Sequence, residues 1–202
     1  MPEWIQYLAE LDRDLFLFLN DIRVDWMDRP MYILTKGWAW AWVYVIIIYF
    51  MAKYYDWKTA IAVVLGVSLV VTFADRGSVE LFKEVFQRLR PSRNPLLEGQ
   101  VNLVTNFDGE IYRGGKYGFV SSHASNYFGL ATYFALILGK FNRKWWFWMM
   151  LWALVVSYTR IYLGVHYPGD IFVGALFGML CGLVAFLIAR FVINRIPNLK
   201  NL

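Results

Sequence analysis

Cysteine and charged side chains are scarce in this chain. It has one cysteine in 202 residues, so no disulfide can form within the chain, and the apolar surroundings of Cys181 indicate a residue packed in a core. Charged residues make up 17%, against 59% hydrophobic and 19% aromatic residues, and the mean hydropathy is +0.43. These values exclude an ordinary soluble domain. We therefore expect one integral membrane domain over residues 1–202.

Long apolar stretches are abundant. A helix that crosses a bilayer needs about 20 mostly apolar residues, and five stretches qualify. They are residues 31–52, 59–82, 119–139, 145–162 and 169–193. The predicted fold is therefore all-α, an integral membrane helical bundle of about five transmembrane helices. The one long connection, residues 84–118, is expected to form an extramembrane loop over an active site.

The first 29 residues have a different pattern. Apolar residues recur at spacings of four and three, which is typical of one face of a helix: Trp4, Leu8, Leu11, Leu15 and Phe18. We expect residues 3–19 to form an amphipathic helix in the membrane interface, within an interfacial segment 1–29. A loosely packed sixth core helix is the alternative. Because the segment is acidic and lacks a signal-peptide pattern, we expect the first span to direct insertion.

The charges between the apolar stretches predict the orientation in the membrane. With five spans, the loops at one end and the C-terminal tail hold a single acid, Asp56, among the cations Lys53, Lys58, Lys140, Arg143, Lys144, Arg190, Arg195 and Lys200. By the positive-inside tendency, this end is cytoplasmic. The acids of residues 1–29 agree with this orientation. The cations of residues 84–118 do not, and we attribute several of them to an anionic ligand.

Histidine, whose ordinary pKa near 6.5 suits proton transfer at neutral pH, occurs only twice. Each copy lies in a polar cluster at the end of an apolar stretch: His123 follows Ser121 and Ser122, and His166 precedes Asp170. With five spans, both clusters and a group of cations after the second span lie on one membrane face, where water can enter. We expect one composite site there.

The start of the third span suits an anion. Free backbone N–H groups and the positive end of the helix dipole lie there, so Ser121 and Ser122 can bind phosphate oxygens. Ser121 can also simply cap the helix, which is the commoner use of a serine at this position. His123, in the first turn, is interesting chiefly because the chain has only one other histidine.

The second histidine has a carboxylate four residues on, at the start of the fifth span. If a helix begins at Pro168, Asp170 can accept a hydrogen bond from one imidazole nitrogen of His166 and leave the other free as a nucleophile. A local cap is the alternative. Arg160, near the end of an apolar span, is expected to face a partner or a wet cavity, and its planar fork matches phosphate oxygens.

Two cations follow the second span. Lys83 and Arg90 are seven residues apart, so on a continuous helix they would share a face about 10 Å apart along the axis. Pro91 disfavours helix at Arg90, which places that arginine where helix gives way to loop. Both can reach one phosphate. The alternative is that they anchor the helix end by extending to lipid headgroups.

These residues together resemble the three-part signature of the type 2 phosphatidic acid phosphatase superfamily, which includes vanadium haloperoxidases and bacterial undecaprenyl-diphosphate phosphatases. The parts are Lys83-x6-Arg90-Pro91, then Ser121-x-His123, then Arg160-x5-His166-x3-Asp170, over about residues 83–170. Two of the three parts depart from the signature in residues that affect backbone and capping chemistry. Val120 and Ser122 stand where the family usually has proline and glycine, and Thr159 replaces a usual serine.

The resemblance implies a role for each residue. His166 would attack phosphorus and form a phosphohistidine, His123 would protonate the leaving oxygen, and Asp170 would orient His166. The phosphoryl oxygens would be held by Lys83, Arg90, Ser121 and Arg160, with backbone N–H groups near Ser122. No metal and no cofactor would be needed. The charge distribution predicts that the site faces away from the cytoplasm. A membrane protein of this branch would lie in a bacterial inner membrane, so the site is expected on the periplasmic face.

The expected partners are the lipid bilayer and a membrane lipid phosphate as substrate, with no nucleic acid and no obligate protein partner. Undecaprenyl diphosphate, phosphatidylglycerophosphate, phosphatidate and a lipid A phosphate all stay open as substrates. Cations of the long loop are expected to be solvated or to bind a second phosphate: Arg88, Arg93, Arg113 and Lys116. Two rival functions are a lipid-to-lipid phosphotransferase and a phospholipid transporter or binding protein without chemistry.

Two further charges lie inside the second span. Asp75, Val79 and Lys83 fall on one helical stripe, and Arg76 is four residues before Glu80. We expect structural pairing within the bundle for both Asp75 and Arg76. A proton path or a substrate path is the alternative.

Overall fold

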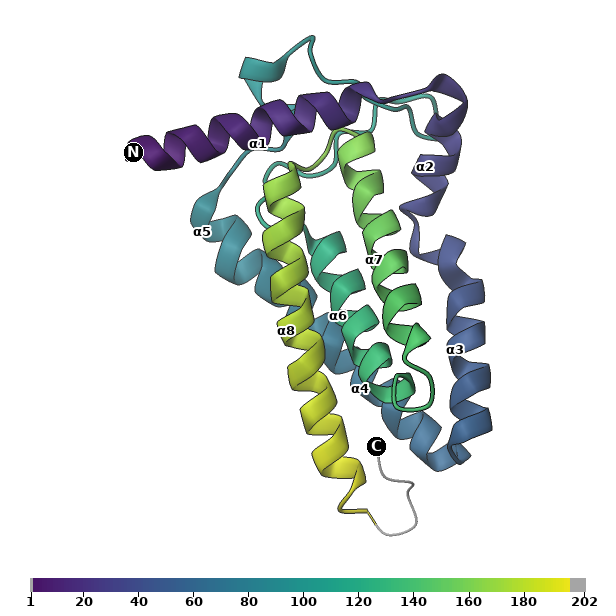
Figure 1. Cartoon of the computed structure of the whole chain (residues 1–202). Helices are drawn as coiled ribbons and strands as arrows, with labels where there is room; N and C mark the ends of the chain where they lie inside the picture. Colours follow the sequence, from purple (N-terminus) through teal and green to yellow (C-terminus); the bar gives the residue numbers. More distant parts are fainter. Residues whose placement is uncertain (1, 197–202) are drawn as a thin grey trace.

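A computed structural model describes residues 2–196, which fold as helices joined by loops with two isolated β-bridges (Figure 1). Lys200, one of the predicted cytoplasmic cations, lies outside these residues. The α-helices are α1 (Glu3–Asp21), α2 (Asp28–Leu34), α3 (Ala41–Tyr54), α4 (Trp57–Gly77), α5 (Glu84–Phe86), α6 (Ser122–Leu138), α7 (Lys144–Tyr162) and α8 (Pro168–Ile193). A π-helical segment, Ser78–Lys83, joins α4 to α5, and short 3₁₀ helices cover Asp25–Met27, Gly37–Trp40, Pro91–Arg93 and Pro95–Leu97.

The predicted all-α membrane bundle is confirmed, with five main helices α3, α4, α6, α7 and α8 (Figure 1). Among the described residues, two segments are long and apolar enough to cross a membrane by themselves, Trp57–Phe86 and Pro168–Ile193. A third crossing can come from the bent pair Asp25–Leu34 and Gly37–Tyr54. The helices α6 and α7 do not meet that criterion, and α6 lies between α4, α7 and α8 inside the bundle.

The first predicted span, residues 31–52, is wrong as one continuous helix. The chain bends by 80° between α2 and the helical segment that ends in α3. Trp40 stabilises the break, because its indole Nε1 donates a hydrogen bond to the carbonyl oxygen of Leu34 at 2.7 Å. That carbonyl is one of those left without an intrahelical partner where α2 ends.

The helix bounds differ from the apolar stretches for local reasons. The second span runs on to Phe86 and stops where Gln87 takes a left-handed conformation with φ of 47°. The third span begins at Ser122 because the hydroxyl of Ser121 accepts a hydrogen bond from the backbone N–H of Ala124. The long loop therefore covers 87–121 instead of the predicted 84–118.

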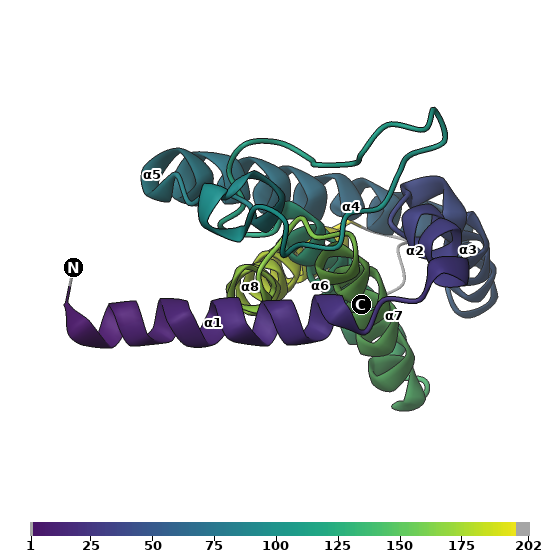
Figure 2. The ribbon, with the colours of Figure 1, turned by 90° about the horizontal axis from the view of Figure 1, so that it is seen from above.

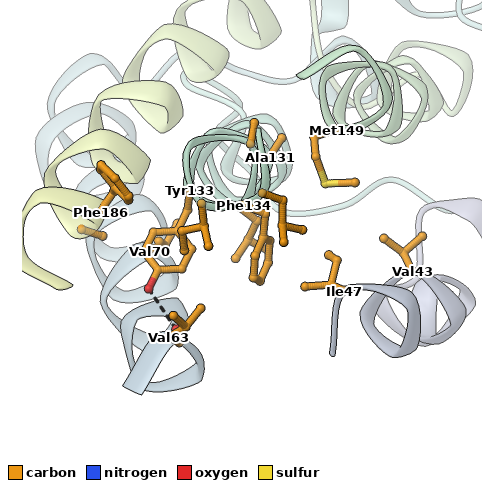
Figure 3. Close-up of a cluster of buried hydrophobic side chains, with 14 of the residues drawn as sticks. Val43, Ile47, Val63, Val70, Ala131, Tyr133, Phe134, Met149 and Phe186 are labelled. Carbon is orange, nitrogen blue, oxygen red and sulfur yellow. Dashed lines mark hydrogen bonds between the residues drawn. The ribbon is translucent and has the colours of Figure 1, made fainter. Parts of the chain in front are cut away.

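The core of the bundle is formed by apolar side chains of α3, α4, α6, α7 and α8 (Figure 3). Val43 and Ile47 of α3 face Phe134 of α6 and Met149 of α7, and Phe186 comes from α8. The buried hydroxyl of Tyr133 donates a hydrogen bond to the carbonyl oxygen of Val63 at 2.9 Å, so no polar atom of that ring is left unpaired.

Helix α1 lies across one end of the bundle (Figures 1 and 2). Within α1 only Phe16 and Asn20 are buried, and its large apolar side chains are exposed: Trp4, Tyr7, Leu8, Leu11, Leu15 and Phe18. Phe16 packs against Tyr167, and Asn20 donates to carbonyl oxygens at the end of α7. This arrangement agrees with the predicted interfacial helix and does not fit a sixth core helix.

The helix ends that carry the polar clusters lie at the same end of the bundle as α1. Figure 1 shows α5, the start of α6, the end of α7 and the start of α8 there, below α1 and the loop 87–121. The three clusters that are distant in sequence are thus brought to one depth in the molecule.

Candidate active site

A cavity of about 240 Å³ lies where the three clusters meet. It is lined by Asp75, Lys83, Arg90, Tyr112, Gly114, Gly115, Ser122, His123, Asn126, Arg160 and His166. Two of the predicted site residues, Ser121 and Asp170, are fully buried and do not line it. The cavity therefore contains most of the predicted side chains and several that the sequence did not indicate.

His166 lies in the short connection between α7 and α8 and is 1% exposed. Its Nε2 atom is 2.9 Å from Nη1 of Arg90, and its Nδ1 atom is 3.3 Å from Oδ2 of Asp170. A guanidinium can only donate, so Nε2 accepts, and the proton is on Nδ1, where it is donated to the carboxylate. The lone pair of Nε2 therefore points towards Arg90, a cation that lines the cavity.

The charge state of the imidazole follows from its surroundings. Burial lowers the pKa of His166 well below its ordinary value of 6.5, and the positive charges of Arg90, Arg160 and Lys83 lower it further. At neutral pH the ring is therefore neutral. A neutral imidazole is the form that can act as a nucleophile.

Asp170 both bonds to His166 and caps α8, two roles that were alternatives in the sequence analysis. Its Oδ2 atom accepts from Nδ1 of His166 and also, at 3.1 Å, from the backbone N–H of Tyr167, which caps α8. Its Oδ1 atom accepts from Nη1 of Arg88 at 2.8 Å. The carboxylate is fully buried, and these three donors satisfy it.

Arg88 was predicted as a solvated loop cation or a second phosphate ligand, and it is instead the centre of an ion-pair network. It joins Asp170 to Asp12 of α1, with Nη2 at 2.8 Å from Oδ2 of Asp12. Its guanidinium stacks on the ring of Tyr167 at 4.0 Å. Burial lowers the pKa of Arg88, but the carboxylates of Asp170 and Asp12 outweigh burial and raise it. The other oxygen of Asp12 accepts from the backbone N–H of Gly169 at 2.7 Å.

Lys83 and Arg90 reach the cavity from different kinds of backbone. Lys83 ends the π-helical segment, and its Nζ atom donates to Oγ of Ser122 at 2.5 Å. Arg90 is in an extended conformation, as expected before Pro91, and its Nε atom donates to the carbonyl oxygen of Tyr117 at 3.1 Å. Burial and the charge of Arg160 lower the pKa of Arg90 to about 10, so it stays protonated at neutral pH.

Arg160 is 2% exposed, which agrees with the expectation of a partner or a wet cavity. Its Nη1 atom donates to Oγ1 of Thr35, and its Nη2 atom donates to the hydroxyl of Tyr112 at 3.1 Å. Among the described residues, its Nε atom has no hydrogen-bond partner. Thr35 follows α2, and Tyr112 lies in the long loop. Neither residue belongs to one of the three polar clusters, so the sequence did not indicate that they would contact Arg160.

The serines at the start of α6 have different positions. The hydroxyl of Ser121 caps the helix by accepting from the backbone N–H of Ala124, and the backbone N–H of Ser121 donates to the carbonyl oxygen of Asp170 at 3.0 Å. Ser122 lines the cavity, and its hydroxyl lies 2.6 Å from that of Ser78. His123, the next residue, lines the same cavity. Of the two serines, Ser122 is thus the one placed to meet a ligand.

The two charges inside the second span do not pair as predicted. Within the described residues no ion pair joins Arg76 to Glu80, because Ser78–Lys83 is a π-helix and the spacing of four residues no longer aligns the two side chains. Asp75 lines the cavity, and its Oδ1 atom accepts from Nδ2 of Asn126 at 3.4 Å.

Two glycines let the long loop approach the site closely. Gly114 has a φ of 64°, and a Cβ atom there would be 3.0 Å from Nη1 of Arg90. A Cβ atom at Gly118 would be 3.0 Å from Oδ2 of Asp170. A side chain at either position would displace a group of the site. In the part of the chain that is described, no group of three or more His, Cys, Asp or Glu could hold a metal ion.

The comparison with known proteins agrees with this geometry. Residues 57–193 match the family model described as the PAP2 superfamily, which covers more than half of the chain. The chain belongs to the PAP2 superfamily. The match begins at α4 and ends at α8, so Asp12 and Thr35 contact the site from outside the matched region.

Relatives and solved structures extend the likeness to most of the chain. The chain is 37% identical over 197 residues to a lipid A 4'-phosphatase of Bacteroides thetaiotaomicron, covering 96% of this chain and 84% of that protein. The crystal structure of Aquifex aeolicus LpxE is similar with a TM-score of 0.59 at 26% identity, covering 88% of this chain and 95% of the other.

A second solved structure shares the fold. The transmembrane PAP2-type phosphatidylglycerolphosphate phosphatase of Bacillus subtilis has a TM-score of 0.63 at 21% identity, covering 96% of this chain and 90% of that chain. Family and relatives together make this PAP2 protein a phosphoric ester hydrolase and an integral membrane protein. The rival prediction of a transporter or binding protein without chemistry is therefore set aside.

Proposed function

We propose that this protein hydrolyses the phosphate headgroup of a membrane lipid by forming a phosphohistidine on His166. The observation that carries the proposal is the environment of that imidazole. Nδ1 is 3.3 Å from a carboxylate oxygen of Asp170, and Nε2 is 2.9 Å from the guanidinium of Arg90. A phosphoryl group that replaces Nε2 as the partner of the Arg90 guanidinium would meet the lone pair of Nε2, as in-line attack on phosphorus requires.

The first step would transfer the phosphoryl group from the lipid to the protein. The bond between phosphorus and Nε2 of His166 forms as the bond to the lipid oxygen breaks, and His123 in its protonated form gives its proton to that oxygen. Asp170 would stabilise the positive charge that develops on the imidazole of His166. Lys83, Arg90 and Arg160 would neutralise the phosphoryl oxygens, and Ser122 would add a hydroxyl donor.

The second step would release inorganic phosphate. His123, now neutral, takes a proton from a water molecule as that water attacks phosphorus and breaks the bond to Nε2. This returns both histidines to their starting states, so one histidine alternates between acid and base. We propose no metal and no cofactor in either step.

Lipid A is our leading candidate for the substrate, with the phosphate in monoester form. The support is the likeness to the lipid A 4'-phosphatase of Bacteroides thetaiotaomicron, which extends over nearly the whole chain. The position of the cavity supports a lipid: it lies at the ends of membrane helices, where a headgroup phosphate would reach it while acyl chains stay in the bilayer.

We further propose that the protein lies in a bacterial inner membrane with the cavity on the periplasmic face. The support is the distribution of charge. The end of the bundle opposite to α1 carries cations in its loops and at the end of α8: Lys53, Lys58, Lys140, Arg143, Lys144, Arg190 and Arg195. Such an excess of lysine and arginine is typical of the cytoplasmic side.

The test is phosphate release by detergent-purified protein with EDTA present, on lipid A, undecaprenyl diphosphate, phosphatidylglycerophosphate and phosphatidate. We expect release from lipid A, and a loss of at least about 10³-fold in kcat in His166→Ala, because the nucleophile is removed. A Tyr117→Phe variant, altered in the long loop 87–121 at a side chain that does not line the cavity, is the control. Equal release by His166→Ala and wild type would overturn the proposed mechanism, and release only from another lipid of the panel would replace the proposed substrate.

A further inference from the structure

Asp75 is a carboxylate in an unusual place. It lies near the end of α4, inside the segment Trp57–Phe86 that is long and apolar enough to cross a membrane. Ionisable residues in such segments are costly, and they usually face a wet cavity and take part in function. Asp75 does line the cavity that contains Lys83 and His166.

The carboxylate of Asp75 has no cation bonded to it among the described residues. Its hydrogen bond comes from the neutral amide of Asn126, which lies one turn after Ser122 on α6 and also lines the cavity. Asp170, by contrast, lies behind the cavity and is ion-paired with Arg88. The negative charge of Asp75 therefore acts on the contents of the cavity directly.

The charges of the side chains that line the cavity can be compared with the charge of a phosphate ligand. Three cations, Lys83, Arg90 and Arg160, are opposed by the single carboxylate of Asp75, and His123 in its protonated form would add one more positive charge. A phosphate monoester carries about −1.5 to −2 at pH 7, and a second phosphoryl group adds roughly one more negative charge. The carboxylate of Asp75 thus removes one positive charge from the lining, which is about the charge by which a diphosphate exceeds a monoester.

We propose that Asp75 is a specificity residue that selects a lipid phosphate monoester over a lipid diphosphate. This inference rests on the proposed phosphatase function, and it specifies which class of lipid phosphate the same cavity prefers. The physical reason is like-charge repulsion: the distal phosphoryl group of a diphosphate would be attacked at His166, and the additional phosphate would bring negative charge close to the carboxylate. Repulsive elements of this kind discriminate between partners that share most attractive contacts.

The experiment compares kcat/KM for two lipids with the same tail, undecaprenyl phosphate and undecaprenyl diphosphate, in wild type, Asp75→Asn and Glu80→Gln. Glu80 is an exposed carboxylate on the neighbouring π-helical segment and does not line the cavity, so Glu80→Gln is the matched control. We expect the ratio of monophosphate to diphosphate to fall about tenfold or more in Asp75→Asn and to stay within about twofold in Glu80→Gln.

A ratio that is unchanged in Asp75→Asn would overturn the proposal, and so would an equal change in Glu80→Gln. The ratio is insensitive to general damage, because loss of folded protein lowers both rates alike. Asp75→Glu keeps the charge and should keep the ratio. If turnover of Asp75→Asn is too slow, thermal-shift titration with inorganic phosphate and pyrophosphate measures the same preference. Failure of the phosphatase function itself would be recognised separately, because wild type and His166→Ala would then release equal phosphate.

Discussion

At the scale of the residue, the central feature is a buried imidazole that is neutral although a carboxylate is beside it. The carboxylate of Asp170 is already satisfied by Arg88 and the backbone of Tyr167, so its effect on His166 is shared. Three cations on the cavity side and burial then decide the protonation state of the ring. The same cations that would bind phosphate thereby keep His166, the proposed nucleophile, unprotonated.

This arrangement predicts a pH dependence. The pKa of His166 is lowered by burial and by Arg90, Arg160 and Lys83, so its protonation, which removes the lone pair, occurs only below about pH 6.5. We expect no loss of kcat/KM from protonation of His166 as pH falls from 8 towards 6.5, and a decline from that protonation only at lower pH. The measurement is a pH profile of kcat/KM, corrected with the phosphate titration of the substrate followed by ³¹P NMR. An acid limb centred above pH 6.5 would contradict it.

At the scale of the element, helix α1 is more than a surface helix. Asp12 accepts hydrogen bonds from both Arg88 and Gly169, the latter in the first turn of α8. The exposed apolar face of α1 suits the membrane interface, and the opposite side contacts the residues that hold Asp170. The position of α1 and the orientation of the Asp170 carboxylate are therefore linked by one ion-pair network.

We predict that Asp12→Asn lowers kcat about tenfold with little change in KM, because a small displacement of the nucleophile affects the reaction more than binding. The amide keeps an acceptor for Gly169 but loses the ion pair with Arg88. The measurement is steady-state kinetics on the substrate found in the lipid panel, with Asp14→Asn as the control, since Asp14 is exposed and bonded to Arg13. Asp12→Glu should recover most of the rate. Equal kcat values for Asp12→Asn and Asp14→Asn would refute the link.

At the scale of the whole molecule, the bundle places a cavity with three cations at one end and a row of basic loops at the other. The cations of the long loop 87–121 lie on the predicted non-cytoplasmic side, which disagrees with the positive-inside tendency. The structure explains two of them. Arg88 is neutralised by Asp12 and Asp170, and Arg90 lines the cavity. Neither one behaves as a free surface charge.

The proposed orientation predicts which loops are accessible from outside the cell. Asp108→Cys lies in the long loop and Asn142→Cys lies between α6 and α7, and both positions are exposed. We expect a membrane-impermeant maleimide to label Asp108→Cys in intact spheroplasts and Asn142→Cys only after the membrane is permeabilised. Cys181 is buried and provides the background. Labelling with the opposite pattern would place the cavity on the cytoplasmic face.

Much of this molecule could be predicted because its chemistry lies at helix ends. Several cavity residues border apolar stretches, so the number of crossings alone brings them to one face: Lys83, Ser122, His123 and Arg160. The bend between α2 and α3 could not be predicted in this way, because hydropathy continues across Leu34–Gly37 while the break depends on a hydrogen bond from Trp40.

The amino-acid sequence by itself determined that this is a helical membrane protein, and the spacing of its polar residues predicted six of the side chains that meet at the cavity. Those properties follow from hydropathy and from local geometry. The tertiary structure decided that Arg88 holds Asp170 instead of a ligand, that Thr35 and Tyr112 hold Arg160, and that Asp75 faces the cavity. Those contacts join residues far apart in the chain, so they exist only once α1, α2, α4 and the long loop have packed around the ends of the bundle.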